Sequence, residues 1–111
     1  MAFLVGQLAL HYRLPARLTE LCQLLWVDRH LWGILMEAVP HLHEAFPRWQ
    51  YLELWACGPP QPLVRAMVML PHDAEQEGLD GIWKFDAGWW VEHFLDTSVQ
   101  VAFDYELLPM S

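Results

Sequence analysis

The sequence predicts a single α+β domain, residues 1–111, in which two N-terminal helices pack on a small, mostly antiparallel sheet. Apolar residues recur every three or four positions early in the 111-residue chain and at every second position later. A run of helices followed by a run of strands is typical of α+β domains. A chain of 111 residues has the length of one domain.

The first two predicted elements are helices. From Pro15 onward, Leu18, Leu21 and Leu25 recur at the spacing of one helix face. Asp28 is placed to cap a second helix, "RHLWGILMEAVPHLHEAF". Pro40 lies inside that run and removes a backbone donor, so we expect a kink or a break just before it.

A β-hairpin is predicted next. Its strands are residues 49–57 and 63–70, and the connecting "CGPPQP" can continue neither a helix nor a strand. The second strand is largely apolar on both faces, which predicts a position inside the sheet.

The first hairpin strand is also apolar on both faces. Trp49, Tyr51 and Trp55 lie in one row, and Leu52 and Leu54 lie in the other. A sheet that is covered by helices on one side buries only one such row. We therefore expect a second layer, from the N-terminal segment or another subunit, and predict a homodimer or a tight heteromer.

The rest of the chain is predicted to be a helical connection, residues 73–95, and a last strand, residues 99–107. Asp73 is placed to cap a short helix and Asp86 a second one. The last strand alternates apolar and polar residues, which indicates one buried face and one wet face.

Two adjacent tryptophans follow the second cap. Neighbouring residues point in different directions, so Trp89 and Trp90 do not face the same surface. In a helix that begins at Asp86, Trp90 points into the core and Trp89 lies at its boundary beside Glu92 and His93. A boundary Trp either covers the edge of the core or offers a partner a large apolar surface.

Composition and charge narrow the classes of function. The formal net charge is −8, which repels a phosphate backbone, so we do not expect direct binding of nucleic acid. Hydrophobic residues make up 55% of the chain and seven residues are Trp, more than a small core needs. The excess predicts an aromatic-rich core or an apolar surface covered by a partner.

The start of the chain and its cysteines indicate a location. The "MAFLVGQLAL" segment is too short to span a membrane and lacks the features of a signal peptide. Cys22 and Cys57 form no disulfide framework, and we expect both in the core. We predict a cytoplasmic protein without membrane contact. The lack of Asn and the single Lys are typical of thermophile or GC-rich bacterial sequences.

The metal and catalytic candidates form no complete set. In an unbroken second helix, Glu37, His41 and Glu44 share one face, but no fourth ligand follows, and we expect no bound metal. Ser98 with His93 lacks the sharp turn of a nucleophile site, and no Gly-rich phosphate motif occurs.

These observations predict a small non-catalytic protein-binding domain without a cofactor, of the kind that an antitoxin, immunity or adaptor protein represents. The partner would be another protein, either one with a basic surface or a further copy of this chain. The predicted contact residues are aromatic or polar: Trp49, Tyr51, Trp55, Asp86, Trp89, Glu92 and His93. Two alternatives stay open, a small enzyme that uses residues near His41 or His93 and a structural subunit of a homo-oligomer.

Overall fold

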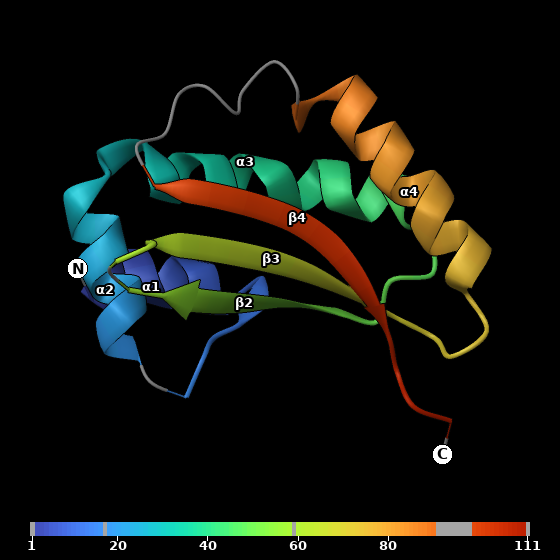
Figure 1. Ribbon diagram of the computed structural model, residues 1–111, viewed down its shortest axis with the longest axis horizontal. Helices are drawn as coiled ribbons and strands as arrows, with labels where there is room; N and C mark the ends of the chain where they lie inside the picture. The colour runs from blue at the N-terminus through green and yellow to red at the C-terminus, as the bar shows by residue number, and fades with distance from the viewer. Residues whose placement is uncertain (1, 17, 59, 91–98, 111) are drawn as a thin grey trace.

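The described part of the chain folds into a four-stranded mixed sheet with a layer of helices on one face (Figure 1). This computed structural model describes residues 2–16, 18–58, 60–90 and 99–110. The helices are α1 (Ala2–Ala9), α2 (Leu18–Val27), α3 (Arg29–Ala45) and α4 (Glu75–Gly88). The strands are β1 (Tyr12–Arg13), β2 (Tyr51–Cys57), β3 (Leu63–Leu70) and β4 (Gln100–Leu107). The α+β class is therefore confirmed.

The sheet has the strand order β1-β2-β3-β4. β2 and β3 form the predicted antiparallel hairpin, with Leu54 opposite Ala66, and β3 has a neighbour on each side. β1 pairs with β2 in parallel, and so does β4 with β3. The predicted antiparallel character therefore holds for the hairpin only, and the sheet is mixed. The reason is that α4 carries the chain back to the end of the sheet where β3 began, so β4 runs in the same direction as β3.

The N-terminal segment contains a helix and a short edge strand, α1 and β1, before the two predicted helices. Tyr12 in β1 is buried, and its hydroxyl donates a 2.7 Å hydrogen bond to the carbonyl oxygen of Leu35 in α3. Burial raises the pKa of Tyr12, which keeps the hydroxyl a donor. This bond joins the first edge of the sheet to the helix layer.

Helix α3 begins at the predicted cap. One carboxylate oxygen of Asp28, Oδ1, accepts a hydrogen bond from the backbone N of His30 at 2.9 Å. The other, Oδ2, accepts one from the backbone N of Val99 at 3.2 Å, so the cap also positions the chain that enters β4. The helix continues through Pro40 to Ala45, so of the two expected outcomes, a kink or a break, the break is wrong. Burial of its apolar stripe outweighs the one lost hydrogen bond.

Helix α4 begins and ends at positions that its capping signals did not predict. It starts after Ala74 without a side-chain cap, because Asp73 pairs with Arg48 at 2.9 Å. Arg48 also pairs with Glu77 at 2.8 Å. Asp86 lies inside α4 and caps no second helix. Residues 91–95 of the predicted connection lie outside the described residues.

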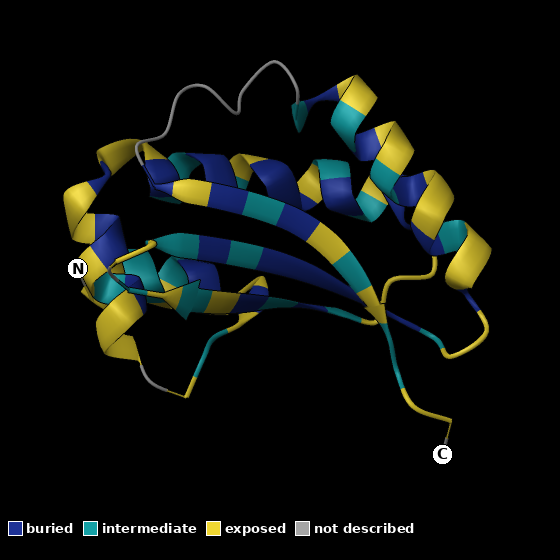
Figure 2. Cartoon of the chain, viewed as in Figure 1, coloured by how far each residue is buried: buried dark blue, intermediate teal, exposed yellow. Residues whose placement is uncertain are grey.

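The core lies between the helix layer and one face of the sheet, the inner face. Figure 2 shows the alternation of buried and exposed positions along the strands. Leu52 and Leu54 of β2 are buried, as are Val101 and Phe103 of β4, so the alternation predicted for the last strand is confirmed. Helix α4 packs closely, because a Cβ at Gly81 would overlap the ring of Phe46.

Candidate functional site

The side of the sheet that faces away from the helices forms the largest candidate surface, which we call the outer face. Helices α1, α2 and α4 each contact α3, so the described helices form one layer and leave this side of the sheet uncovered (Figure 1). Strand alternation assigns these residues to the outer face: Arg13, Tyr51, Glu53, Trp55, Cys57, Leu63, Arg65, Met67, Met69, Gln100, Ala102, Asp104 and Glu106.

The outer face changes from basic to acidic across the strands. One row of paired residues runs from Arg13 in β1 through Glu53 and Met67 to Asp104 in β4. The next row along the strands in one direction is Tyr51, Met69 and Glu106, and in the other direction it is Trp55, Arg65 and Ala102. The outer face therefore has a basic residue, Arg13, at its β1 edge and acidic residues, Asp104 and Glu106, at its β4 edge. Its centre is aromatic and apolar except for Glu53 on β2 and Arg65 on β3.

The aromatic residues of the outer face are only partly covered. Trp55 is 39% exposed. Tyr51 is half-buried, with the guanidinium carbon of Arg13 3.7 Å from its ring centre, a cation–π contact. Cys57 is exposed and Cys22 half-buried, so the prediction that both cysteines lie in the core is wrong. Cys57 occupies an outward-pointing position at the end of β2.

Trp49 lies just before β2 and is positioned by α3. Its indole stacks on the imidazole of His43, with ring centres 3.9 Å apart and an angle of 8° between the planes. Trp49 is 37% exposed. Trp49 therefore lies partly exposed at the β1 edge of the molecule, and not in a row with Trp55 as predicted.

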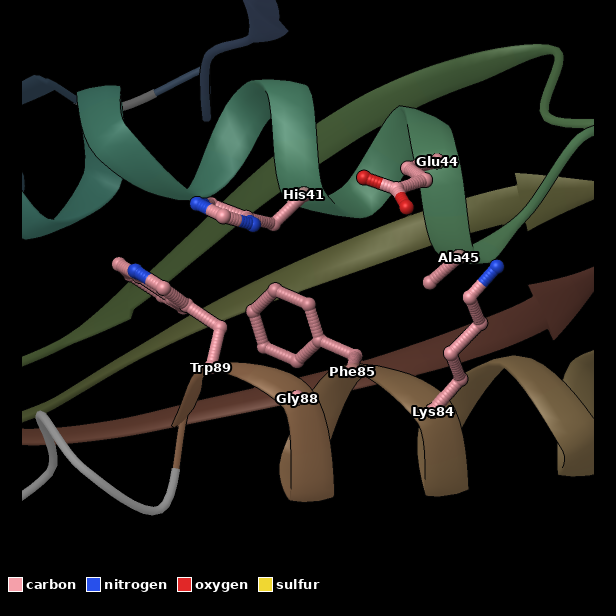
Figure 3. Close-up of a pocket in the computed structure, with 7 residues that line it drawn as sticks. All are labelled: His41, Glu44, Ala45, Lys84, Phe85, Gly88 and Trp89. Atoms are coloured by element: carbon pink, nitrogen blue, oxygen red, sulfur yellow. The ribbon is translucent and has the colours of Figure 1, made fainter.

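A second candidate is a cavity of about 250 Å³ between α3 and α4. His41, Glu44, Lys84 and Trp89 are among its lining residues (Figure 3). The imidazole of His41 stacks on the indole of Trp89, with ring centres 5.0 Å apart. His41 makes no side-chain hydrogen bond to Glu44 or Lys84 in the described structure, so the cavity holds no assembled acid and base pair.

The two adjacent tryptophans have the opposite arrangement to the predicted one. Trp89 is 8% exposed and packs against Phe85 and Phe103, whereas Trp90 is half-buried and meets Phe103 edge-on at 4.6 Å. The prediction failed because α4 starts at Glu75 and not at Asp86, which changes the direction in which each ring points. A buried Trp89 offers a partner little surface.

The other predicted site residues are dispersed. Asp86 is half-buried on α4; burial, with a smaller effect of Asp104, raises the pKa of its carboxyl group. Glu37 is exposed on α3, and within the described ranges no three His, Cys, Asp or Glu side chains come close enough to hold a metal ion, so Glu37, His41 and Glu44 do not converge. Glu92 and His93 lie outside the described residues.

Sequence analysis missed two exposed tryptophans. Trp26 at the end of α2 is 80% exposed and Trp83 on α4 is 78% exposed. The buried stripe of α4 runs through Gly78, Gly81 and Phe85, and Trp83 is off that stripe. The small residues in the buried stripe are the signal that could have revealed the exposure of Trp83, since glycines permit close helix packing and mark the buried side of α4.

No protein-family model, curated protein or solved structure matches this chain. An assignment of function therefore depends on the geometry above. Among the helices in the described ranges, none is long and apolar enough to cross a membrane.

Proposed function

We propose that this chain is a small, non-catalytic protein-binding domain of the cytoplasm that binds its partner through the outer face of its sheet. The observation that supports the proposal is the position of Trp55 and Tyr51 on a sheet face that no described helix covers. Exposed aromatic rings on such a face are the usual anchors of protein interfaces. Both cysteines are free, as in proteins of reducing compartments.

The charge pattern favours a second copy of the chain as the partner. Two outer faces can meet through a two-fold axis that runs along the strands between β2 and β3. Such a rotation places β1 of one copy over β4 of the other, and β2 over β3. The basic β1 edge of each copy then faces the acidic β4 edge of its partner, so the outer face is complementary to itself.

The strand register gives the contacts of this dimer. Arg13 of each copy lies opposite Asp104 of the other, because both belong to one row of the sheet. Trp55 lies opposite Arg65 of the other copy, a pairing suited to a cation–π contact, and Tyr51 lies opposite Met69. Trp55 is the residue with the largest expected share of the binding free energy.

Sedimentation equilibrium of the wild type, Trp55→Ala and Trp26→Ala tests the proposal. Trp26 is the matched control, since it is an exposed tryptophan on the helix layer. We expect a wild-type dimer, no change in Kd for Trp26→Ala, and a Kd roughly 1,000-fold higher for Trp55→Ala, from the loss of about 2 kcal/mol at each of the two symmetric hot spots.

Two outcomes would decide against the second copy. A wild-type monomer at high concentration would leave a different protein as the partner, which purification from the native host with Trp55→Ala as the negative control would then identify. Equal weakening by Trp26→Ala and Trp55→Ala would place the interface elsewhere.

A further inference from the structure

A cavity of about 420 Å³ lies at the β1 edge of the molecule, where the end of α1, β1, the second half of α3 and the start of β2 meet. Apart from Tyr12, whose hydroxyl bonds to Leu35, five of its lining residues carry polar groups or aromatic rings that a ligand could contact: His11, Arg13, His43, Trp49 and Tyr51. The volume lies within the range of small-molecule sites, about 300 to 1,000 Å³. The cavity has no lining residue in common with the α3–α4 cavity, and it shares Arg13 and Tyr51 with the outer face.

Three basic groups gather in this cavity although the chain carries a net charge of −8. Among the residues that the structure describes, the ion pairs are those of Arg48 with Asp73 and Glu77. His11, Arg13 and His43 therefore have no carboxylate within pairing distance in that part of the chain. Unpaired cations on several walls of one cavity are the arrangement that binds an anion.

The aromatic residues hold two of these cations in place. Trp49 stacks on the face of His43 at 3.9 Å, and Tyr51 lies under the guanidinium of Arg13 at 3.7 Å. Stacking uses the faces of the imidazole and guanidinium groups and leaves the N–H groups at their edges to donate hydrogen bonds. The same indole and phenol rings supply an apolar wall beside the donors.

The surroundings of His43 disfavour its charged form. Burial and, to a smaller extent, the nearby His11 lower the pKa of His43. An anion bound beside His43 opposes this effect and favours its protonated form.

We propose that this cavity binds a phosphate monoester with an aromatic or apolar body. Two imidazolium groups and one guanidinium group match the charge of up to −2 and the three oxygens of a phosphate monoester better than the single charge of a carboxylate. The phosphate lies among His11, Arg13 and His43, and the body of the ligand lies against Trp49 and Tyr51. Arg13 and Tyr51 also belong to the outer face, so the ligand and a second copy seated on that face use the same two side chains.

Calorimetric titration of the full chain with phenyl phosphate at pH 6.0 tests the proposal. We expect saturable binding of one ligand per chain. Inorganic phosphate, which lacks the ring, and benzoate, which lacks the second charge, should each bind at least fivefold more weakly. Benzyl alcohol, which has no charge, should not bind. Benzoate binding as tight as that of phenyl phosphate would overturn the assignment to a phosphate monoester.

Raising the pH to 8.5 should weaken binding at least fivefold. The titratable or charged groups that face the cavity are His11, Tyr12, Arg13, His43 and Tyr51. Histidine is the residue type that changes charge between pH 6.0 and 8.5, and it donates both N–H groups only when protonated. Unchanged affinity at pH 8.5 would contradict the role of the imidazoles.

Variants locate the site. The double variant His11→Gln and His43→Gln should bind phenyl phosphate at least tenfold more weakly, and Arg13→Gln at least fivefold more weakly. The matched control is His30→Gln with His72→Gln, which changes two exposed histidines outside the cavity and should leave affinity unchanged. Thermal melts confirm that each variant is folded. No binding by the wild type, or equal loss in the control, would overturn the proposal.

Discussion

Strand β2 carries large apolar residues on both faces of the sheet, but its two rows lie in different surroundings. On the inner face, Leu52 and Leu54 are buried beneath the helix layer. On the outer face, Tyr51 and Trp55 alternate with them along the same strand and stay partly exposed, beside charges that change sign across the sheet. The comparison shows that apolar character alone does not decide burial within the chain, because the helices can cover only one of the two rows.

The largest expected effect concerns the helix side of the molecule. Trp89→Ala removes a buried ring that contacts Phe85 and Phe103, and it should lower the free energy of unfolding by roughly 3 to 5 kcal/mol. Trp90→Ala removes a half-buried ring and should cost about 1 to 2 kcal/mol. Urea unfolding of the two variants makes the measurement. A larger loss for Trp90→Ala would mean that the end of α4 is oriented differently.

The next largest expected effect is the difference in stability lost at two neighbouring residues, Leu54 on the inner face and Trp55 on the outer face. Leu54→Ala leaves a cavity beneath the helices and should cost about 2 to 5 kcal/mol of unfolding free energy. Trp55→Ala should cost about 1 kcal/mol in the monomer, because much of its ring is already in contact with solvent. Denaturant unfolding at low protein concentration separates these costs from dimerisation. Equal losses would mean that the outer row is also part of the core.

The smallest effect concerns Asp86 on α4. Burial and Asp104 raise the folded-state pKa of Asp86, so the folded state binds a proton more readily than the unfolded state does. Stability from this group is therefore greatest below the unfolded pKa, near 3.8, and is lost as the pH rises through the folded pKa. Asp86→Asn should raise the free energy of unfolding at pH 7 by less than about 1 kcal/mol, since solvent still screens this half-buried group near the end of α4.

Thermal melts at pH 7 and pH 4 check this effect. The melting temperature of Asp86→Asn should exceed that of the wild type at pH 7, and the difference should shrink at pH 4. A lower melting temperature for the variant at pH 7 would show that the carboxylate has a stabilising contact.

The sequence predicted the helices and strands that depend on residues close together in the chain. The hairpin and β4 follow from period-2 alternation, and the start of α3 follows from Asp28, which does cap it. β1 was not predictable, because it pairs with Leu52 and Glu53, about forty residues away in the chain. Asp73 has a good local capping signal, but Arg48, 25 residues distant in sequence, takes its carboxylate.

The candidate sites were predictable to a similar extent. The exposed row of Tyr51 and Trp55 follows from strand alternation and the surplus of apolar residues. The cavity at the β1 edge could not be predicted, because His11, His43 and Trp49 come from three segments that only the tertiary fold brings together. His43 and Trp49 are six residues apart in the sequence, and no helix or strand periodicity at that spacing predicts that their rings stack.

The central claim, that a second copy covers the outer face, is tested most directly by exchanging charges. Arg13→Asp sets two acids opposite each other in its homodimer, and Asp104→Arg sets two bases opposite each other. Each variant alone should have a dimer Kd roughly 30-fold above that of the wild type, from about 1 kcal/mol at each of two symmetric contacts. An equimolar mixture restores both pairs, and sedimentation equilibrium should show a heterodimer close to wild-type affinity. A mixture that stays as weakly associated as its components would contradict the face-to-face dimer.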